Sequence, residues 1–263
     1  MSGKVYLVGA GPGDPELLTL KALRLLRTAE VVLHDDLVTP EILQLISPAA
    51  EVQNVGKRCG SKTIRQEEIN FLMVTRAGSG LQVVRLKSGD PLIFGRAGEE
   101  IEALRQSNIE YEIVPGVTSV LGAAAAAGIP LTHRQLSSAL VLIAGHRASE
   151  NSAADWSQFA GAESTLTIYM PGHNYAELAA RLRQAGFAPE IPCAIISRAT
   201  TPQQRIHRTT VSELHRAPKL ASPTLLVVGE VVRFADSDLV EKAASSLHLE
   251  QALEAAASGT PGV

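Results

Sequence analysis

Short apolar runs alternate with amphipathic stretches along most of the chain, and this alternation predicts strands followed by helices. The first run, residues 4–8, is rich in Val and Tyr and predicts a buried strand. A glycine turn follows, after which Asp14 can cap a helix over 16–27 with apolar residues at helical spacing. The same order continues with strands expected over 30–34, 81–86 and 111–114 and helices over 40–46, 66–76 and 97–106. Such alternation favours a mostly parallel sheet covered on both faces.

The pair Pro115-Gly116 interrupts this series, and the alternation restarts beyond it. An Ala-rich helix is expected from Thr118 and a further helix over 175–184, with strands over 140–144, 165–170, 194–198 and 225–229. The pattern therefore predicts two consecutive α/β domains, residues 1–115 and 116–236. Residues 237–263 form a separate tail, in which 239–256 has the pattern of an amphipathic helix.

Composition narrows the class of protein. The 263 residues are 45% hydrophobic and 19% charged, as expected of a globular chain. A net charge of -3 offers no bulk positive field for nucleic acid, so an anionic substrate would be met by locally placed Arg and Lys. The two cysteines and seven histidines show no metal-ligand spacing, and no segment reads as a signal peptide or membrane span. We therefore expect a cytoplasmic, soluble protein without a metal site and without nucleic-acid or membrane partners.

The glycine turn from Gly9 to Gly13 is the first candidate binding loop. A dinucleotide fingerprint needs glycine where this chain has Asp14, and a pyrophosphate would meet that carboxylate. Asp35 nevertheless follows at the distance of a ribose-binding acid, so an NAD-dependent oxidoreductase stays open as an alternative. A purely structural turn is a third interpretation.

Other candidate residues follow expected strands or open an expected helix. The segment 85–96 contains Gly89, which permits close backbone approach, and the turn-forming Asp90-Pro91. Asp35 and Lys57 could handle protons if they share a cleft, although isolated charged loop residues are usually only solvated. Thr118 and Ser119 could cap a helix or bind a ligand at its N-terminus.

Taken in order, these segments resemble the tetrapyrrole methylase family over about the first 234 residues. The matching segments are GAGPGDPELLTLKA (9–22), DDLV (35–38), VGKR (55–58), RLKSGDPLIFGRAGEE (85–100), VPGVTSV (114–120), GIPLTHR (128–134), ATTPQQR (199–205) and SPTLLVVGEVV (222–232). The resemblance implies two α/β domains with a cofactor cleft between them, and a homodimer. It implies methyl transfer from S-adenosyl-L-methionine to carbons of uroporphyrinogen III, in two steps that give precorrin-2, with S-adenosyl-L-homocysteine as by-product.

The resemblance also assigns roles to individual residues. Asp35 corresponds to the proton acceptor and Lys57 to the proton donor. Three residues correspond to contacts with the macrocycle or its carboxylates: Arg96, Glu99 and Arg134. Positions that contact or border the cofactor correspond to Pro12, Ser88, Gly89, Asp90, Ile93, Thr118, Ser119, Met170, Ala199 and Thr224.

Several positions depart from the family pattern. Ser88 and Ala97 stand where glycine is usual, Lys62 where a histidine is common, and His34 where a tyrosine often precedes the acid. None of these removes a proposed catalytic residue. A sister methylase acting on a later corrinoid precursor or on another acceptor remains an alternative, as does a non-catalytic protein that only binds the cofactor.

Overall fold

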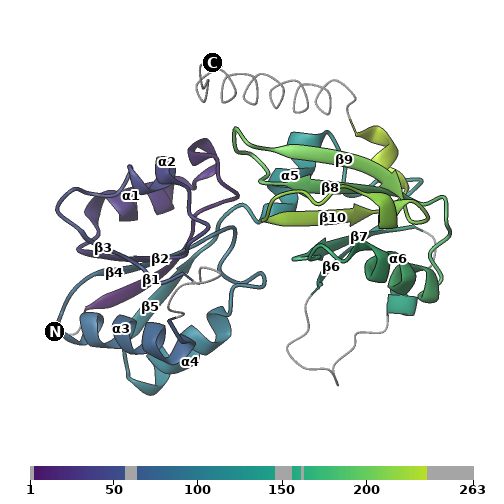
Figure 1. Ribbon diagram of the computed structural model, residues 1–263. Coiled ribbons are helices and arrows are strands. Elements are labelled where there is room, and N and C mark those ends of the chain that lie inside the picture. Colours follow the sequence, from purple (N-terminus) through teal and green to yellow (C-terminus); the bar gives the residue numbers. More distant parts are fainter. Residues whose placement is uncertain (1–2, 57–63, 146–155, 161–162, 236–263) are drawn as a thin grey trace, which may run out of the picture. The chain divides into compact units, whose positions relative to one another are not determined.

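The computed structural model describes residues 3–56, 64–145, 156–160 and 163–235, and the chain divides into two compact units, Met1–Gly122 and Ala123–Val263. The boundary between the units falls inside helix α5 (Ser119–Ala127), a few residues beyond the breaker pair Pro115-Gly116. Each unit contains one five-stranded sheet with helices packed on it (Figure 1). The predicted fold class, two consecutive α/β units, is confirmed.

The first unit is built on a fully parallel sheet with strand order β3-β2-β4-β1-β5. Its strands are β1 (Lys4–Gly9), β2 (Val31–His34), β3 (Glu51–Asn54), β4 (Val83–Lys87) and β5 (Glu110–Val114). Its complete helices are α1 (Leu20–Thr28), α2 (Pro40–Leu43), α3 (Gln66–Gly78) and α4 (Ala97–Gln106). Because β4 returns to pair between β2 and β1, the connections that leave β1 and β4 run to opposite faces of the sheet (Figure 1).

Two apolar layers hold these helices on the sheet. Helices α1 and α2 pack on one face through Leu26 and Ile42, while α3 and α4 pack on the other through Met73 and Leu104. All four side chains are fully buried or nearly so. At about 1.5–3 kcal/mol for each large apolar side chain removed from water, these layers supply much of the stability of the unit. They also fix where the strand ends lie.

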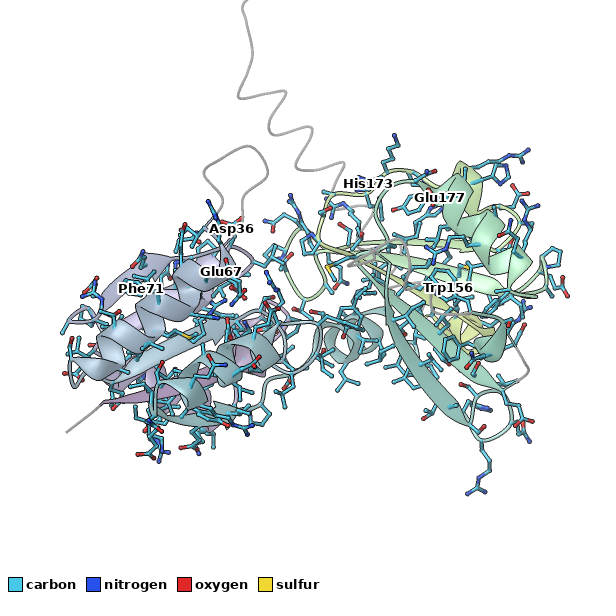
Figure 2. The ribbon with its side chains drawn as sticks, turned by 90° about the horizontal axis from the view of Figure 1, so that it is seen from below. Asp36, Glu67, Phe71, Trp156, His173 and Glu177 are labelled. Carbon is cyan, nitrogen blue, oxygen red and sulfur yellow. The ribbon has the colours of Figure 1, made fainter. Side chains whose placement is uncertain are left out.

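The second unit contains a mixed sheet with strand order β6-β7-β10-β8-β9. The strands are β6 (Ala139–Ala144), β7 (Ser164–Tyr169), β8 (Pro192–Ser197), β9 (Arg205–Thr210) and β10 (Thr224–Val228). Helix α6 (Tyr175–Gln184) packs on one face of this sheet. Trp156, labelled in Figure 2, is buried against that helix, and the Arg181 guanidinium carbon lies 3.9 Å from the centre of its ring.

Two expectations about these elements are wrong. The single helix expected over 16–27 is a short 3-10 turn (Pro15–Leu17) followed by α1. Asp14 does cap the first turn, because its side chain accepts from the Glu16 N–H. The backbone is then extended at Leu18, and Thr19 caps α1 by accepting from the Ala22 N–H. The second sheet is mostly antiparallel, because β10 and the unforeseen strand β9 both pair antiparallel with β8. The helix expected over 239–256 lies outside the described residues.

Candidate functional site

Loops from three neighbouring strands meet at the carboxyl edge of the first sheet, between β1 and β4. Open α/β sheets bind ligands where adjacent connections leave toward opposite faces, and here those are the connections after β1 and β4. Gly11 and Gly89 join the two loops by reciprocal backbone hydrogen bonds, from the Gly11 N–H at 3.1 Å and from the Gly89 N–H at 2.8 Å. Thr39, in the loop after β2, donates to the Gly13 carbonyl at 2.8 Å. The glycine turn is therefore fastened on both sides.

Three glycines allow these loops to touch through their backbones. A Cβ atom placed on Gly9 would lie 2.6 Å from the Gly116 backbone, and one placed on Gly116 would lie 2.3 Å from the Gly89 carbonyl oxygen. Gly89 also has φ +69, a left-handed conformation that favours glycine. We therefore name Gly9, Gly89 and Gly116 the glycine junction. No side chain larger than hydrogen fits at Gly9 or Gly116 without moving backbone.

Asp90 ties the loop after β4 to the loop after β5. Its Oδ1 accepts from the Leu92 N–H at 2.8 Å, and its Oδ2 accepts from the Gly116 N–H at 3.0 Å. Hydrogen bonds to a carboxylate are stronger than neutral ones, so this residue holds the glycine junction closed. The predicted cofactor contacts of this unit follow β1, β4 and β5, the last of them at the start of α5: Pro12, Ser88, Gly89, Asp90, Ile93, Thr118 and Ser119.

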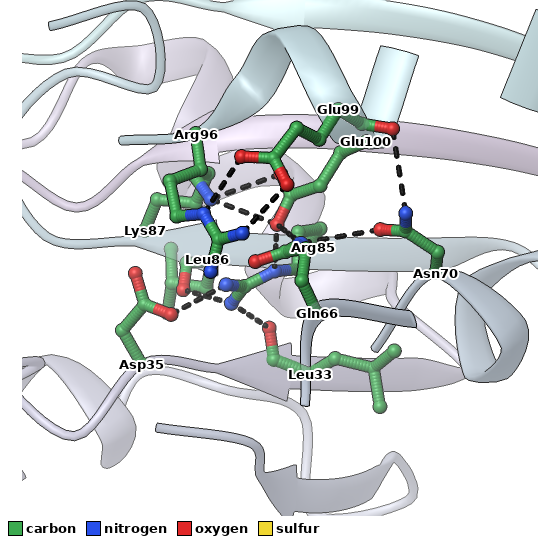
Figure 3. A network of polar contacts seen from close by, with 10 residues as sticks. All are labelled: Leu33, Asp35, Gln66, Asn70, Arg85, Leu86, Lys87, Arg96, Glu99 and Glu100. Atoms are coloured by element: carbon green, nitrogen blue, oxygen red, sulfur yellow. Dashed lines mark hydrogen bonds and ion pairs between the residues drawn. The ribbon is translucent and has the colours of Figure 1, made fainter. Parts of the chain in front are cut away.

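Asp35 follows β2 at the same sheet edge and is held by β4. Its N–H donates to the Leu86 carbonyl at 3.0 Å, and its Oδ1 accepts from the Arg85 Nη2 at 2.5 Å. The Asp35 side chain is 29% exposed, whereas that of Arg85 is 3% exposed. Figure 3 shows the Arg85 guanidinium reaching between Asp35 and Glu100.

Behind Asp35 lies a buried ionic cluster that the sequence did not lead us to expect. The Glu100 carboxylate, on the first turn of α4, accepts from the Lys87 Nζ at 2.9 Å on both oxygens and from the Arg85 Nε at 2.9 Å (Figure 3). Gln66 donates to the same carboxylate at 3.4 Å. We call Arg85, Lys87 and Glu100, together with Asp35, the ionic cluster.

Burial and neighbouring charge act on the cations of the ionic cluster in different ways. Burial alone would lower the pKa of Arg85, but the Asp35 and Glu100 carboxylates outweigh it and raise that pKa. Burial, and after it the charge of Arg85, lowers the pKa of Lys87. Arg85 therefore stays charged. One feature of the sequence could have indicated the cluster. Arg85 and Lys87 lie two residues apart in an apolar strand, so their side chains share one face of the sheet.

Arg96 and Glu99 lie at the exposed start of α4. The Arg96 Nε and Nη2 donate to the two Glu99 carboxylate oxygens at 2.7 and 2.6 Å, a bidentate pair. The hydrogen bond to Glu99 raises the pKa of Arg96. Arg96 also has φ 56, a strained conformation for a residue with a side chain. Glu99 engages one edge of the guanidinium, so further donors of Arg96 can bind a second carboxylate.

In the second unit, three predicted cofactor contacts meet at one edge of the sheet. The register pairs Thr224 with Ser197 and Leu225 with Tyr169, which sets Met170 beside Thr224 and places Ala199 two residues beyond the end of β8. Met170 has φ 51 and is 48% exposed. Ala199 and Thr224 are largely buried.

Within the second unit, Arg134 lies apart from the three predicted cofactor contacts. Arg134 is exposed and precedes β6, at the opposite edge of the second sheet from Met170, and the neighbouring His133 ring lies 5.1 Å from that of Phe234. Lys57, the expected proton donor, lies outside the described residues, as does Lys62. Among the residues that the structure describes, no group of three or more His, Cys, Asp or Glu could hold a metal ion. No helix in this described part is long and apolar enough to cross a membrane.

Two α/β units with a glycine-closed loop cluster at the carboxyl edge of a parallel sheet define a ligand-binding α/β protein. The chain belongs to the tetrapyrrole (corrin/porphyrin) methylase family, whose model matches residues 4–215. The predicted resemblance is confirmed, and with it the assignment to the methylases.

Solved structures resemble the chain over nearly all of their length. A uroporphyrin-III C-methyltransferase from Thermus thermophilus, complexed with S-adenosyl homocysteine, is 42% identical with a TM-score of 0.77, covering 88% of this chain and 99% of that one. A cobalt precorrin-4 methyltransferase is 32% identical with a TM-score of 0.76, covering 87% of this chain and 95% of that one.

The curated relatives are longer. A sirohaem synthase from Tolumonas auensis is 47% identical over 236 residues, which are 89% of this chain and 50% of that protein. The chain therefore spans about half the length of the curated relatives it matches.

Proposed function

We propose that this chain transfers methyl groups from S-adenosyl-L-methionine to two ring carbons of uroporphyrinogen III, giving precorrin-2. The observation that carries the proposal is the match, over 99% of its length, to the Thermus thermophilus methyltransferase that binds S-adenosyl homocysteine. The curated relatives named sirohaem synthase support the same substrate class. Other activities of those longer proteins are not part of the proposal.

The geometry of the glycine turn argues against the oxidoreductase alternative. The Gly11 N–H donates to the Gly89 carbonyl, and the Glu16 N–H donates to the Asp14 carboxylate. Both N–H groups are therefore already hydrogen-bonded within the protein. A bound pyrophosphate would need such N–H groups to point at it and would meet the Asp14 carboxylate. The glycine junction instead offers close backbone approach for a ligand with less negative charge. The sulfonium of S-adenosyl-L-methionine suits this edge, where the Asp90 carboxylate supplies negative charge.

The roles that we propose for the binding residues are those that the family resemblance implies. Two sets of residues contact the cofactor: Pro12, Ser88, Gly89, Asp90, Ile93, Thr118 and Ser119 at the edge of the first sheet, and Met170, Ala199 and Thr224 at the edge of the second. Uroporphyrinogen carries a ring of carboxylates, and Arg96, oriented by Glu99, binds one of them. Arg134 binds another, as the family resemblance implies. Two copies of the chain form the active enzyme.

The chemistry needs alignment and the removal of one proton. S-adenosyl-L-methionine supplies an already activated methyl group, so the protein mainly has to hold the ring carbon in line with it. As the carbon–carbon bond forms from an electron pair of the ring, the sulfur–methyl bond breaks and its pair stays on the leaving S-adenosyl-L-homocysteine, so the macrocycle becomes cationic. Asp35 then accepts a proton from the ring at its carboxylate, and the bonding electron pair stays on the macrocycle. Lys57 acts as the proton donor in the same proposal.

Two experiments test the proposal. Isothermal titration should give tight binding of S-adenosyl-L-methionine and S-adenosyl-L-homocysteine and negligible binding of NAD or NADP. Binding of NAD with none of S-adenosyl-L-methionine would refute the cofactor assignment. Incubation with uroporphyrinogen III and methyl-labelled cofactor should then label the macrocycle. Label transfer to a later corrinoid precursor but not to uroporphyrinogen III would favour a sister methylase. The match to the cobalt precorrin-4 methyltransferase is the observation that supports this alternative.

A further inference from the structure

The ionic cluster places charge where this fold ordinarily has apolar side chains. Strand β4 pairs on both sides with parallel strands, β2 and β1, and both faces of the sheet are covered. The side chains of Arg85 and Lys87 are nevertheless charged and 3% exposed, and that of Glu100 is fully buried. Removing such charges from water costs as much as, or more than, their attraction returns, so a buried ion pair is weak evidence of stabilisation. The cluster therefore calls for a functional explanation.

Arg85 is held on all three of its guanidinium nitrogens. Its Nε donates to Glu100 at 2.9 Å and its Nη1 donates to the Leu33 and Leu86 carbonyls at 3.3 Å, so two edges are fixed by α4 and by the sheet. The remaining nitrogen, Nη2, donates to the Asp35 Oδ1. A guanidinium anchored in this way cannot turn without breaking several buried hydrogen bonds at once.

Asp35 is the one member of the ionic cluster with a substantially exposed side chain, at 29%. The Arg85 bond engages Oδ1, and the hydrogen bond from the Asp35 N–H to Leu86 fixes the backbone beside it. These two anchors set the direction of the other carboxylate oxygen, Oδ2. Buried second partners of this kind orient reactive side chains, and their loss commonly lowers activity.

From these contacts we propose that Arg85 is a positioning residue, which holds the Asp35 carboxylate in the orientation needed to accept the proton released after methyl transfer. Glu100 fixes Arg85, and the carboxylates of Glu100 and Asp35 balance the charges of Arg85 and Lys87. The proton moves from the macrocycle to the Asp35 Oδ2, while Arg85 keeps all of its own protons. The inference rests on the proposed function, because it needs Asp35 to be the proton acceptor.

Lys87 provides a matched control within the cluster. Arg85→Met and Lys87→Met each remove one buried cation from the same face of β4, leave the same net charge and introduce the same unbranched side chain. Both cations donate to Glu100, and Arg85 donates in addition to Asp35 and to the Leu33 and Leu86 carbonyls. A role limited to charge balance predicts equal losses of kcat in the two variants. The lost hydrogen bonds to the Leu33 and Leu86 carbonyls should appear in the free energy of unfolding of Arg85→Met.

The experiment measures kcat, the KM for uroporphyrinogen III and the affinity for S-adenosyl-L-homocysteine in seven proteins. These are the wild type, Asp35→Asn, Arg85→Met, Lys87→Met, Arg85→Lys and the double variants Asp35→Asn/Arg85→Met and Asp35→Asn/Arg85→Lys. Arg85→Met should lower kcat about ten- to a hundredfold. The KM and the S-adenosyl-L-homocysteine affinity should stay within a few-fold. Lys87→Met should lower kcat clearly less than Arg85→Met does. Because Arg85 acts through Asp35, adding Arg85→Met to Asp35→Asn should cause no further loss.

The outcomes separate this inference from the proposed function. Equal losses in the two methionine variants, a wild-type kcat in Arg85→Met, or additive losses in the double variant would overturn the positioning role and leave Asp35 as the proton acceptor. A wild-type kcat in Asp35→Asn would remove the proton acceptor itself and the inference with it. Urea unfolding checks that each protein is folded. If the methionine variants do not fold, Arg85→Lys decides, because a lysine cannot bridge both carboxylates and should lower kcat in wild type but not in Asp35→Asn.

Discussion

Substitution of Gly116 by alanine tests whether the glycine junction holds the binding loops together. The new Cβ atom would lie 2.3 Å from the Gly89 carbonyl oxygen and 2.8 Å from the Gly9 Cα, whereas ordinary contact begins at 3.4 Å. Both neighbours are backbone, so no side chain can turn away. The loop after β5 must therefore shift by about 1 Å, a displacement that can cost a site roughly a hundredfold.

The same displacement should be visible in stability. Overpacking costs about 1–3 kcal/mol, and weakening the hydrogen bond from the Gly116 N–H to Asp90 adds to it, so we expect the free energy of unfolding to fall by about 2–4 kcal/mol. Gly78, the last residue of α3, is the control, because a Cβ atom there meets nothing within 4 Å. Gly78→Ala should be neutral or stabilising by up to about 1 kcal/mol.

Urea unfolding and isothermal titration with S-adenosyl-L-homocysteine measure both effects. We expect Gly116→Ala to be destabilised and to bind about a hundredfold more weakly, and Gly78→Ala to bind like the wild type. If Gly116→Ala matches Gly78→Ala in both measurements, the loops do not depend on this contact and the interpretation of the site is wrong.

Variants of four further residues probe substrate binding, proton removal and the stability of the second unit. Arg96→Ala should raise the KM for uroporphyrinogen III about ten- to a hundredfold, with partial recovery in Arg96→Lys, and an unchanged KM would place the carboxylates elsewhere; Arg134→Ala should act in the same direction. Asp35→Asn should lower turnover about 10²–10⁴-fold and leave cofactor affinity within a few-fold, and a wild-type rate would leave Asp35 without a catalytic role. Burial lowers the pKa of His207 below its ordinary 6.5, so the unfolded chain binds a proton more readily and stability falls as the pH drops below 6.5. Urea midpoints at about pH 7 and about pH 5 should therefore differ less in His207→Gln than in the wild type, and equal differences would refute this.

Strands buried on both faces were the elements easiest to predict from the sequence. The runs that became β1, β2 and β4 are apolar and bounded by turns, and α4 and α6 have helical periodicity, so these elements were expected within a few residues. Strand β9 was missed because its sequence, RIHRTT, has one large apolar residue and lies at a sheet edge. Its pairing with β8 comes from tertiary contacts rather than from a local pattern.

The candidate site was predictable to the extent that it depends on turns. Gly89, Asp90 and Asp35 are marked in the sequence by their position after apolar runs, and the structure brings them to one sheet edge. The ionic cluster was not predictable, because Glu100 lies on a helix that the sequence alone cannot pair with β4. Similarly, Arg134 follows a recognisable motif, but its place relative to Met170 depends on how the second sheet is ordered.

The most direct test of the central claim is the mass of the product formed from uroporphyrinogen III with excess S-adenosyl-L-methionine. We predict that a species heavier by one methylene appears first and is then converted into one heavier by two, with one equivalent of S-adenosyl-L-homocysteine released for each. Accumulation of the singly methylated species as the final product would argue for a different methylase of this family. A macrocycle of unchanged mass, with the chain folded and S-adenosyl-L-methionine bound, would contradict the proposed function.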